Sequence, residues 1–449
     1  MNLVLAVVSA VVLALAFPKF NLFFLAFFAL VPLFIALSQA RGWRERVGAG
    51  FVFGFVFFLI HLSWLLTLQR FVAGWSVLAW LFLSLFQALF VMVFAFGFSK
   101  VKNNPFLIAL LWVAIEFLRA QGPFGITGGG VGYSMVPFLA LVQIASFTSV
   151  YGVSFLVVLV NACLANIRKP EAKRFGFPTL IILVVAIIFG LFSLQTKQVA
   201  SHSVKLALIQ PNLDQKVKLD PGRVNETFAI YQGMTRKAFS ERPDIIVWPE
   251  TAVFTYMLQN QRLLPQLKAL AREAQAWLVF GTPHLEKDKS YNSIVAISPQ
   301  GEVLGRYDKC QLVPFGEYLP FKTILYPILK RVGYYEAEFA PGQPRGLKVG
   351  RFNIAAAICF ESVFPNLIKE RVKADSDFIL LVTNDAWFND SSALYFHLNC
   401  GVFRAIENHS YFIQVGNTGI SAVIDPLGRV LEKTRVNHRE TLIFEIPLP

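Results

Sequence analysis

Charged residues are scarce in this chain. They make up 15% of its 449 residues, whereas soluble globular proteins carry about 25%. Apolar residues account for 55%, and the mean hydropathy is +0.55. Long apolar runs are absent after residue 195 but crowd the residues before it. This division predicts a helical membrane domain over residues 1–195 and a globular domain over residues 196–449.

Acidic residues are few in the first region, which has 3 Asp and Glu against 12 Lys and Arg. The second region has 25 against 29, so 9 of the 13 net positive charges lie in the first region. No basic stripe interleaved with aromatic residues occurs, and we therefore expect no binding of nucleic acid. We instead expect the uneven distribution of positive charge to reflect which linkers lie on the cytoplasmic side of the membrane.

Cysteine is also rare. The four residues Cys163, Cys310, Cys359 and Cys400 lack paired CxxC spacing, which excludes a disulfide scaffold. We expect Cys163, Cys310 and Cys400 to be packing residues, with a Cys310–Cys400 bridge as the alternative. The six histidines show no HExxH spacing, so neither a metal nor another cofactor is expected.

Seven apolar segments are expected to span the membrane, the first being retained because it lacks a basic start and a cleavage site. Linkers after the second, fourth and sixth segments hold nine Lys and Arg, and the linkers between them hold three. Since cytoplasmic loops are rich in Lys and Arg, residues 196–449 should lie outside the cytoplasm; an even number of spans would invert this. The segments are Leu3–Phe17, Leu22–Leu37, Val47–Leu66, Val77–Phe98, Phe106–Leu118, Val150–Ala165 and Phe177–Leu194.

Two polar features of the first region allow two interpretations each. The loop Gln121–Met135, which contains three consecutive glycines, is either an ordinary turn or a surface that admits lipid. Glu116 and Arg119 are three residues apart, so they can pair across one helical turn. The alternative for these two side chains is contact with a phospholipid headgroup.

The second region alternates short β-branched runs with helical segments, which predicts a layered α/β domain. The turn Ser298–Gly301 between two such runs predicts a hairpin. The expected strands are Val204–Ile209, Asp244–Val247, Trp277–Phe280, Ser293–Ile297, Glu302–Tyr307, Asn353–Ile358, Phe378–Val382 and Thr441–Pro449, and the expected helices are Asn225–Phe239, Leu263–Ala276 and His397–Asn408.

Three strands of this region end on an ionisable residue: Glu250, Lys309 and Cys359. A thiol with a pKa of about 8.5 is mostly protonated at neutral pH, and Glu250 could take its proton. Lys309 would hold the carboxylate and offer positive charge to an oxyanion. Main-chain amides after Cys359 would add stabilisation, commonly worth about 3–4 kcal/mol.

These motifs resemble the nitrilase (carbon–nitrogen hydrolase) superfamily, and with the membrane region in front of them they resemble the apolipoprotein N-acyltransferase family. The resemblance rests on Trp248-Pro249-Glu250, on Lys309 followed by Leu312-Val313-Pro314-Phe315-Gly316-Glu317, on Cys359-Phe360-Glu361, on Thr383-Asn384-Asp385-Ala386-Trp387-Phe388 and on Arg404-Ala405-Ile406-Glu407-Asn408.

The resemblance implies a polytopic α-helical membrane region followed by an α/β nitrilase-like αββα four-layer sandwich. By motif position Cys359 is the nucleophile, Glu250 the base, Lys309 the essential lysine and Glu317 a supporting carboxylate. Phe360 and Glu361 follow the nucleophile as further supporting residues. Phe360 stands where relatives usually have tyrosine, so no side-chain hydroxyl is available at that position.

The reaction that the resemblance implies has two steps. Cys359 takes an acyl chain from a phospholipid, typically phosphatidylethanolamine, as a thioester. The α-amino group of the diacylglyceryl-cysteine of an apolipoprotein then accepts the chain as an amide. The expected enzyme is a monomer in the bacterial cytoplasmic (inner) membrane, with its catalytic domain on the periplasmic side. A membrane-anchored amidase, in which water resolves the thioester, is the alternative, and a non-enzymatic lipid-binding scaffold is a third hypothesis.

Loop side chains could also form arms that dip into lipid and admit the acyl chain. This hypothesis concerns Tyr334, Tyr335, Phe339, Phe364, Leu367 and Ile368.

Overall fold

The chain consists of two compact units. The computed structural model describes residues 1–101, 104–196, 200–330, 338–372 and 375–448. A helical unit comprises Met1–Thr196 together with Ser391–Glu407, and an α/β unit comprises Lys197–Asp390 and Asn408–Pro449. The segment 391–407, which lies late in the sequence, is therefore part of the helical unit.

The helical unit holds fewer full-length apolar helices than the seven expected spans. By length and composition, three helices of the described residues can cross a membrane: Trp75–Val101, Ala145–Ala165 and Arg174–Ser193. The pair Trp43–His61 and Ser63–Val72, bent by 46°, gives a fourth if it counts as one span. The helices are α1 (Asn2–Leu15), α2 (Ala26–Ala29), α3 (Val31–Gln39), α4 (Trp43–His61), α5 (Gln69–Val72), α6 (Trp75–Phe98), α7 (Pro105–Arg119), α8 (Leu139–Val142), α9 (Ala145–Ala165), α10 (Pro170–Ser193) and α16 (Ser392–Asn408).

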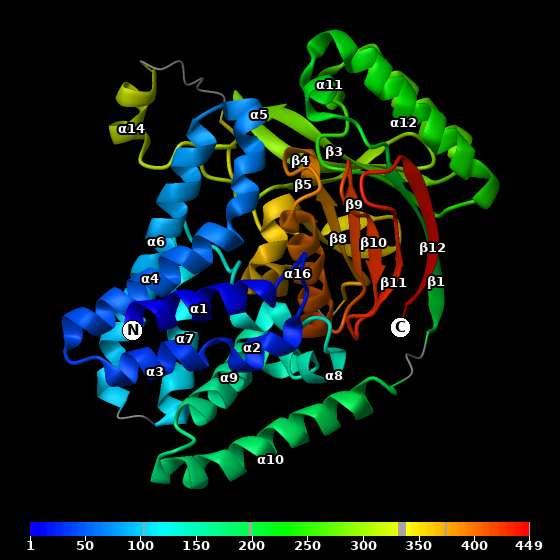
Figure 1. Cartoon of the computed structure of the whole chain (residues 1–449). Helices are drawn as coiled ribbons and strands as arrows, with labels where there is room; N and C mark the ends of the chain where they lie inside the picture. The colour runs from blue at the N-terminus through cyan, green and yellow to red at the C-terminus, as the bar shows by residue number, and fades with distance from the viewer. Residues whose placement is uncertain (102–103, 197–199, 331–337, 373–374, 449) are drawn as a thin grey trace. The chain divides into compact units, whose positions relative to one another are not determined.

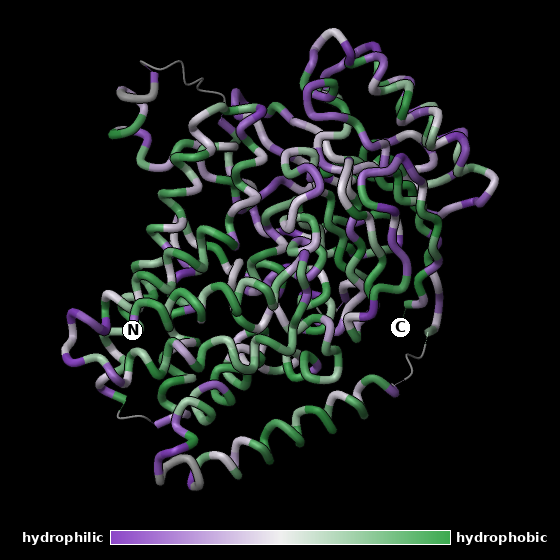
Figure 2. Tube along the Cα trace, viewed as in Figure 1, coloured by the Kyte–Doolittle hydropathy of each residue, from purple (hydrophilic) through white to green (hydrophobic). Residues whose placement is uncertain are grey.

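Helix α10 exposes apolar rather than polar side chains. Of the most apolar 18-residue stretch within Arg174–Ser193, only 17% is buried within the protein. Phe177, Leu180 and Val185 are among the exposed side chains. Figure 2 shows this helix as hydrophobic over most of its length. An exposed apolar surface of this extent is typical of a membrane-spanning helix, for which α10 is also long enough.

Helix α9 is broken at Ser149, whose φ of 56° and ψ of −178° are not helical. The break leaves the next main-chain N–H groups without partners in the preceding turn. The Glu407 carboxylate of α16 accepts from Ser149 Oγ at 2.6 Å and from Val150 N at 2.9 Å. It also pairs with Arg404 at 2.7 Å. Glu407 therefore caps the second part of α9.

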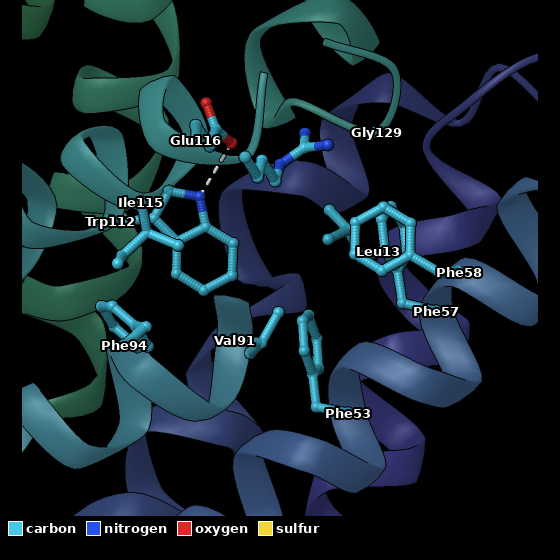
Figure 3. A pocket seen from close by; sticks show the side chains of 11 residues that line it. Leu13, Phe53, Phe57, Phe58, Val91, Phe94, Trp112, Ile115, Glu116 and Gly129 are labelled. Carbon is cyan, nitrogen blue, oxygen red and sulfur yellow. Dashed lines mark hydrogen bonds between the residues drawn. The ribbon is translucent and has the colours of Figure 1, made fainter. Parts of the chain in front are cut away.

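The glycine-rich loop is held by Glu116 and Arg119, which are both buried. Arg119 donates to the carbonyl oxygens of Ile126 and Gly128 at 3.0 and 2.7 Å, and Glu116 accepts from Val131 N at 2.8 Å. Figure 3 shows the hydrogen bond from Trp112 to Glu116. No ion pair within 4.0 Å joins Glu116 to Arg119 among the described residues; each side chain binds loop main chain.

The α/β unit contains two six-stranded sheets (Figure 1). The first has the order β12-β1-β2-β3-β4-β5 and the second the order β11-β10-β9-β8-β7-β6. In each sheet three strands are parallel, β1-β2-β3 and β7-β8-β9, and the flanking strands are antiparallel. The strands are β1 (His202–Gln210), β2 (Ile245–Trp248), β3 (Trp277–Glu286), β4 (Lys289–Ile297), β5 (Val303–Asp308), β6 (Leu347–Val349), β7 (Phe352–Ile358), β8 (Phe378–Thr383), β9 (Phe412–Gly416), β10 (Ala422–Ile424), β11 (Val430–Lys433) and β12 (Glu440–Leu448).

The main core lies between the two sheets. Side chains alternate between the two faces of a strand, so every second residue of each sheet points into this core. In β1, Leu206 and Leu208 join a buried cluster that also contains Ile354 of β7 and Leu380 of β8. The intervening residue Ala207 faces a second cluster, on the helix-covered side of the first sheet. Two sheets face to face with helices outside them confirm the predicted layered fold.

Helices α12 (Val224–Ala238) and α13 (Leu263–Ala274) supply this second cluster with side chains such as Phe228 and Leu267. The shorter helices are α11 (Gln215–Leu219), α14 (Lys322–Leu329) and α15 (Pro365–Arg371). Among the residues expected to dip into lipid, Ile368 lies on α15 and is only 1% exposed, so the prediction for this residue is wrong. Tyr334 and Tyr335 lie outside the described residues.

Candidate active site

The site forms where strands end. Glu250 is separated from the end of β2 by Pro249 alone, Lys309 follows β5 directly, and Cys359 follows β7 directly. The carboxyl ends of parallel strands open a crevice that binds ligands in α/β sheets. Gly281 of β3 lies so close to this loop that an added Cβ would be 2.6 Å from the Glu250 Cα. The main chain around Glu250 is therefore packed tightly.

Two carboxylates share one buried ammonium. Lys309 Nζ lies 2.9 Å from Glu317 and 3.5 Å from Glu250, and the lysine is 1% exposed. Asn292 of β4 bridges the same carboxylates, since its Nδ2 donates to Glu250 Oε1 at 2.7 Å and to Glu317 Oε1 at 2.8 Å. Val313 N holds the other oxygen of Glu317 at 2.8 Å. The side chains predicted at Glu250, Lys309 and Glu317 are thus brought together.

Cys359 stands at a sharp turn between β7 and the 3-10 turn Cys359–Val363. Its φ is 50°, in the left-handed region that a side chain adopts at a cost. A strained strand-to-helix turn of this kind presents a nucleophile at the end of a sheet. The sulfur interacts electrostatically with Glu250 and Lys309, and with Asp385 after β8.

Burial sets the resting protonation of these groups. It raises the pKa of the Cys359 thiol, and the negative charge of Glu250 raises it further, while Lys309 opposes the shift. Burial alone would lower the pKa of Lys309, but the charges of Glu317 and Glu250 raise it above its ordinary value. The resting site therefore holds a neutral thiol beside a permanently charged lysine, and attack requires a base to remove the thiol proton.

Glu361, which is fully buried, joins the Cys359 turn to the loop that carries Lys309. Its carboxylate accepts from Ile358 N at 2.8 Å, from Cys310 N at 2.8 Å and from Arg371 Nη2 at 2.8 Å. Further donors are Gln311 N and the hydroxyl of Tyr307. None of these bonds reaches a reacting group, so the geometry gives Glu361 a positioning role.

The other predicted residues take lesser places. Phe360 packs edge-on against Phe364, with ring centroids 5.0 Å apart. Cys310 and Cys400 are not joined, since no disulfide occurs among the four cysteines. No group of three or more His, Cys, Asp or Glu side chains within the described residues could hold a metal ion.

Sequence reasoning missed two residues at this site. Asn292 lies at the start of a hairpin strand and was not singled out. Its position between Tyr291 and Ser293, directly before an apolar run, could have indicated a polar residue at a strand end. Lys218, 1% exposed, donates to the carbonyl oxygen of Glu250 at 2.7 Å. A lysine between Val217 and Leu219 gives no comparable signal.

Solved structures similar to the α/β unit include a nitrilase-superfamily protein of Saccharomyces cerevisiae, 17% identical, with 56% of this chain and 93% of that chain covered and a TM-score of 0.44. An amidase from Nesterenkonia sp. is 18% identical, with 56% and 94% covered and a TM-score of 0.42.

Comparisons by sequence cover nearly the whole chain. The carbon–nitrogen hydrolase model matches residues 205–449, and the apolipoprotein N-acyltransferase N-terminal domain model matches residues 9–163. Apolipoprotein N-acyltransferase of Geobacter metallireducens is 36% identical over 99% of this chain and 89% of that protein. The Aquifex aeolicus enzyme of the same name is 31% identical over 97% and 96%. The chain therefore belongs to the apolipoprotein N-acyltransferase family, and in its sequence a carbon–nitrogen hydrolase domain follows the membrane helices.

Proposed function

We propose that this enzyme moves a fatty acyl chain from a phospholipid to the N-terminal α-amino group of diacylglyceryl-cysteine in apolipoproteins, through a thioester on Cys359. The observation that carries the proposal is the shared ammonium of Lys309 between Glu250 and Glu317, beside a cysteine at a strained turn. This arrangement supplies a base, a fixed positive charge and a nucleophile without any metal.

In the first step Glu250 takes the proton of the Cys359 thiol as the sulfur attacks the ester carbonyl. Lys309 and the main-chain amide of Phe360 stabilise the oxyanion, and the lysophospholipid leaves after it has received the proton. In the second step the α-amine attacks the thioester, Glu250 removes a proton from the amine, and the thiolate of Cys359 leaves and is reprotonated. A thioester is reactive enough toward an amine for the second step to need no ATP.

The organisation of the chain supports a lipid substrate. We propose that residues 1–195 form the membrane domain and residues 196–449 the catalytic domain. Phosphatidylethanolamine is the proposed acyl donor, and the enzyme acts as a monomer in the bacterial inner membrane. The excess of Lys and Arg in alternate linkers supports a periplasmic position for the catalytic domain. Protease accessibility of residues 196–449 in intact spheroplasts tests this side, and protection from added protease would contradict it.

The decisive experiment uses the purified full-length protein with phosphatidylethanolamine labelled in its sn-1 chain and a diacylglyceryl peptide. We expect labelled Cys359 in intact-mass spectra before peptide is added, and labelled peptide afterwards. The Cys359→Ala variant should give neither product. Release of free fatty acid without labelled peptide would instead support the membrane-anchored amidase.

A further inference from the structure

The site contains a second buried lysine that the proposed chemistry does not yet use. Lys218 lies on α11, the one-turn helix that follows β1, and its side chain is 1% exposed. Its ammonium donates to the main-chain carbonyl of Glu250 at 2.7 Å. No carboxylate lies within 4.0 Å of this ammonium among the described residues. Burying a charge without a paired carboxylate destabilises the folded state, and buried ionisable groups of this kind are concentrated at functional sites.

A chain of buried amides fixes the helix that carries Lys218. Asn384, directly after β8, donates to Gln215 Oε1 at 2.8 Å. Asn417, directly after β9, donates to Asn384 Oδ1 at 2.9 Å and to Leu213 O at 3.0 Å. These bonds connect α11 to the ends of β8 and β9, of which β8 pairs with β7, the strand that Cys359 directly follows. Lys218 is therefore held rigidly against the catalytic edge of the sheet.

The charges around the site make a second cation useful. Glu250 and Glu317 bring two negative charges, and Lys309 supplies one positive charge. A protonated Lys218 balances the second carboxylate. Lys218 also donates to the main-chain carbonyl of Glu250, the proposed base. Glu250 is therefore held both through its main chain, by Lys218, and through its carboxylate, by Lys309 and Asn292.

We propose that Lys218 is a positioning residue for acyl transfer: through the Glu250 carbonyl it fixes the base, and its positive charge offsets the second carboxylate of the site. This inference rests on the proposed role of Glu250. Lys218 acts through the main chain of Glu250, to which its ammonium is bonded. It should therefore change the rate of acylation more than the apparent affinity for phospholipid.

The protonation of Lys218 offers a readout that a merely structural lysine lacks. Burial lowers the pKa of Lys218 to about 7, although the negative charge of Glu250 opposes the shift, as would a negative charge on Cys359 if its thiol ionised. Beyond these two groups, Lys309 pairs with both Glu250 and Glu317, Asp385 interacts electrostatically with Cys359, and Lys216 on the same helix is exposed. The cation is present below about pH 7 and is lost as the pH rises through that value.

The test measures the rate of thioester formation on Cys359 with labelled phosphatidylethanolamine between pH 5.5 and 9. Lys218→Met should slow acylation by about 10- to 100-fold at pH 6.5, a change of about 1.4–2.7 kcal/mol at 1.36 kcal/mol per factor of ten, with little change in KM. Lys218→Arg keeps the charge at every pH. It should retain most of the rate and abolish the decline that wild-type protein shows above pH 7.

The matched control is Lys216→Met, which removes an exposed lysine two residues away and should leave the rate and the pH profile unchanged. Wild-type rates in Lys218→Met, or an unchanged pH profile in Lys218→Arg, would overturn the inference. Glu250→Gln separates this failure from that of the proposed function. If Glu250→Gln still acylates Cys359, the proposed base is wrong; if it does not while Lys218→Met does, only the role of Lys218 is lost.

Discussion

Replacement of Glu361 by Gln should destabilise the protein far more than one neutralised carboxylate usually does. Both members of the Glu361–Arg371 pair are fully buried, 2.8 Å apart. Two further nitrogens of Arg371, Nε and Nη1, have no hydrogen-bond partner within the described residues. The carboxylate is thus the main compensation for a buried guanidinium, assisted by the ring of Tyr307 at 5.0 Å.

Removing one partner of a buried pair typically costs about 3–5 kcal/mol. The new amide group would also face main-chain N–H donors at Ile358 and Cys310, which now bond to the carboxylate. In a domain of roughly 150–250 residues each kcal/mol lowers Tm by about 2–4 °C, so we expect Glu361→Gln to lower it by roughly 6–20 °C.

The assay is the unfolding transition of the full chain in detergent, followed by tryptophan fluorescence at one fixed scan rate. Glu241→Gln is the control, because Glu241 pairs with Lys205 at the surface, where ion pairs contribute about 0–1 kcal/mol. Glu361→Gln combined with Arg371→Met should recover part of the loss, since no unpaired buried charge remains. A Glu361→Gln melting temperature equal to that of Glu241→Gln would refute the reasoning.

Three other changes test single features of the structure. Asn292→Leu should lower the acylation rate by at least about tenfold, measured as thioester formation, because Glu250 loses a hydrogen bond to its carboxylate; a wild-type rate would contradict the bridge. Gly281→Ala should also slow acylation, since its Cβ would push on the Glu250 backbone, whereas Gly233→Ala, with nothing within 4 Å, should not. Glu407→Leu should lower Tm through loss of the cap on α9, and an unchanged Tm would show that the break in α9 needs no cap.

The sequence was most informative where local chemistry and local structure agree. The strands around Glu250 and Cys359 were predictable because apolar β-branched runs form buried strands and the polar residue comes at their ends. The hairpin of β4 and β5 was predictable from the Gly301 turn, whose φ is 81°. Strand β9 was not predicted, because Gln414 interrupts its apolar run; in the fold its Nε2 donates to the carbonyl oxygen of Ile420, six residues away.

Partners distant in sequence could not be predicted from one chain. The carboxylate of Glu407 caps a helix break 257 residues earlier at Val150, and no local pattern indicates such a contact. Lys218 and Glu250 are separated by 32 residues and by α12, so the hydrogen bond between them depends on how β1 and β2 pair. Seven spans were expected, whereas three or four helices of the described residues are long enough to cross a membrane, because apolar content alone does not fix helix length: α1 has 14 residues and α7 has 15.

The protonation of the nucleophile connects the geometry to the choice of substrate. Some cysteine enzymes activate the thiol in advance by pairing it with a cation that lowers its pKa. Here burial and Glu250 raise the pKa of Cys359, and Lys309 is already occupied by two carboxylates. A thiol in this state reacts slowly with small electrophiles, and under the proposed mechanism it becomes nucleophilic only when Glu250 removes its proton as it attacks the bound carbonyl. Resting wild-type protein should therefore react with iodoacetamide at pH 7 more slowly than a free thiol of ordinary pKa, and should be acylated by phospholipid at the same pH. Rapid alkylation at Cys359 would show that the thiolate is present at rest and that Glu250 is not needed as a base.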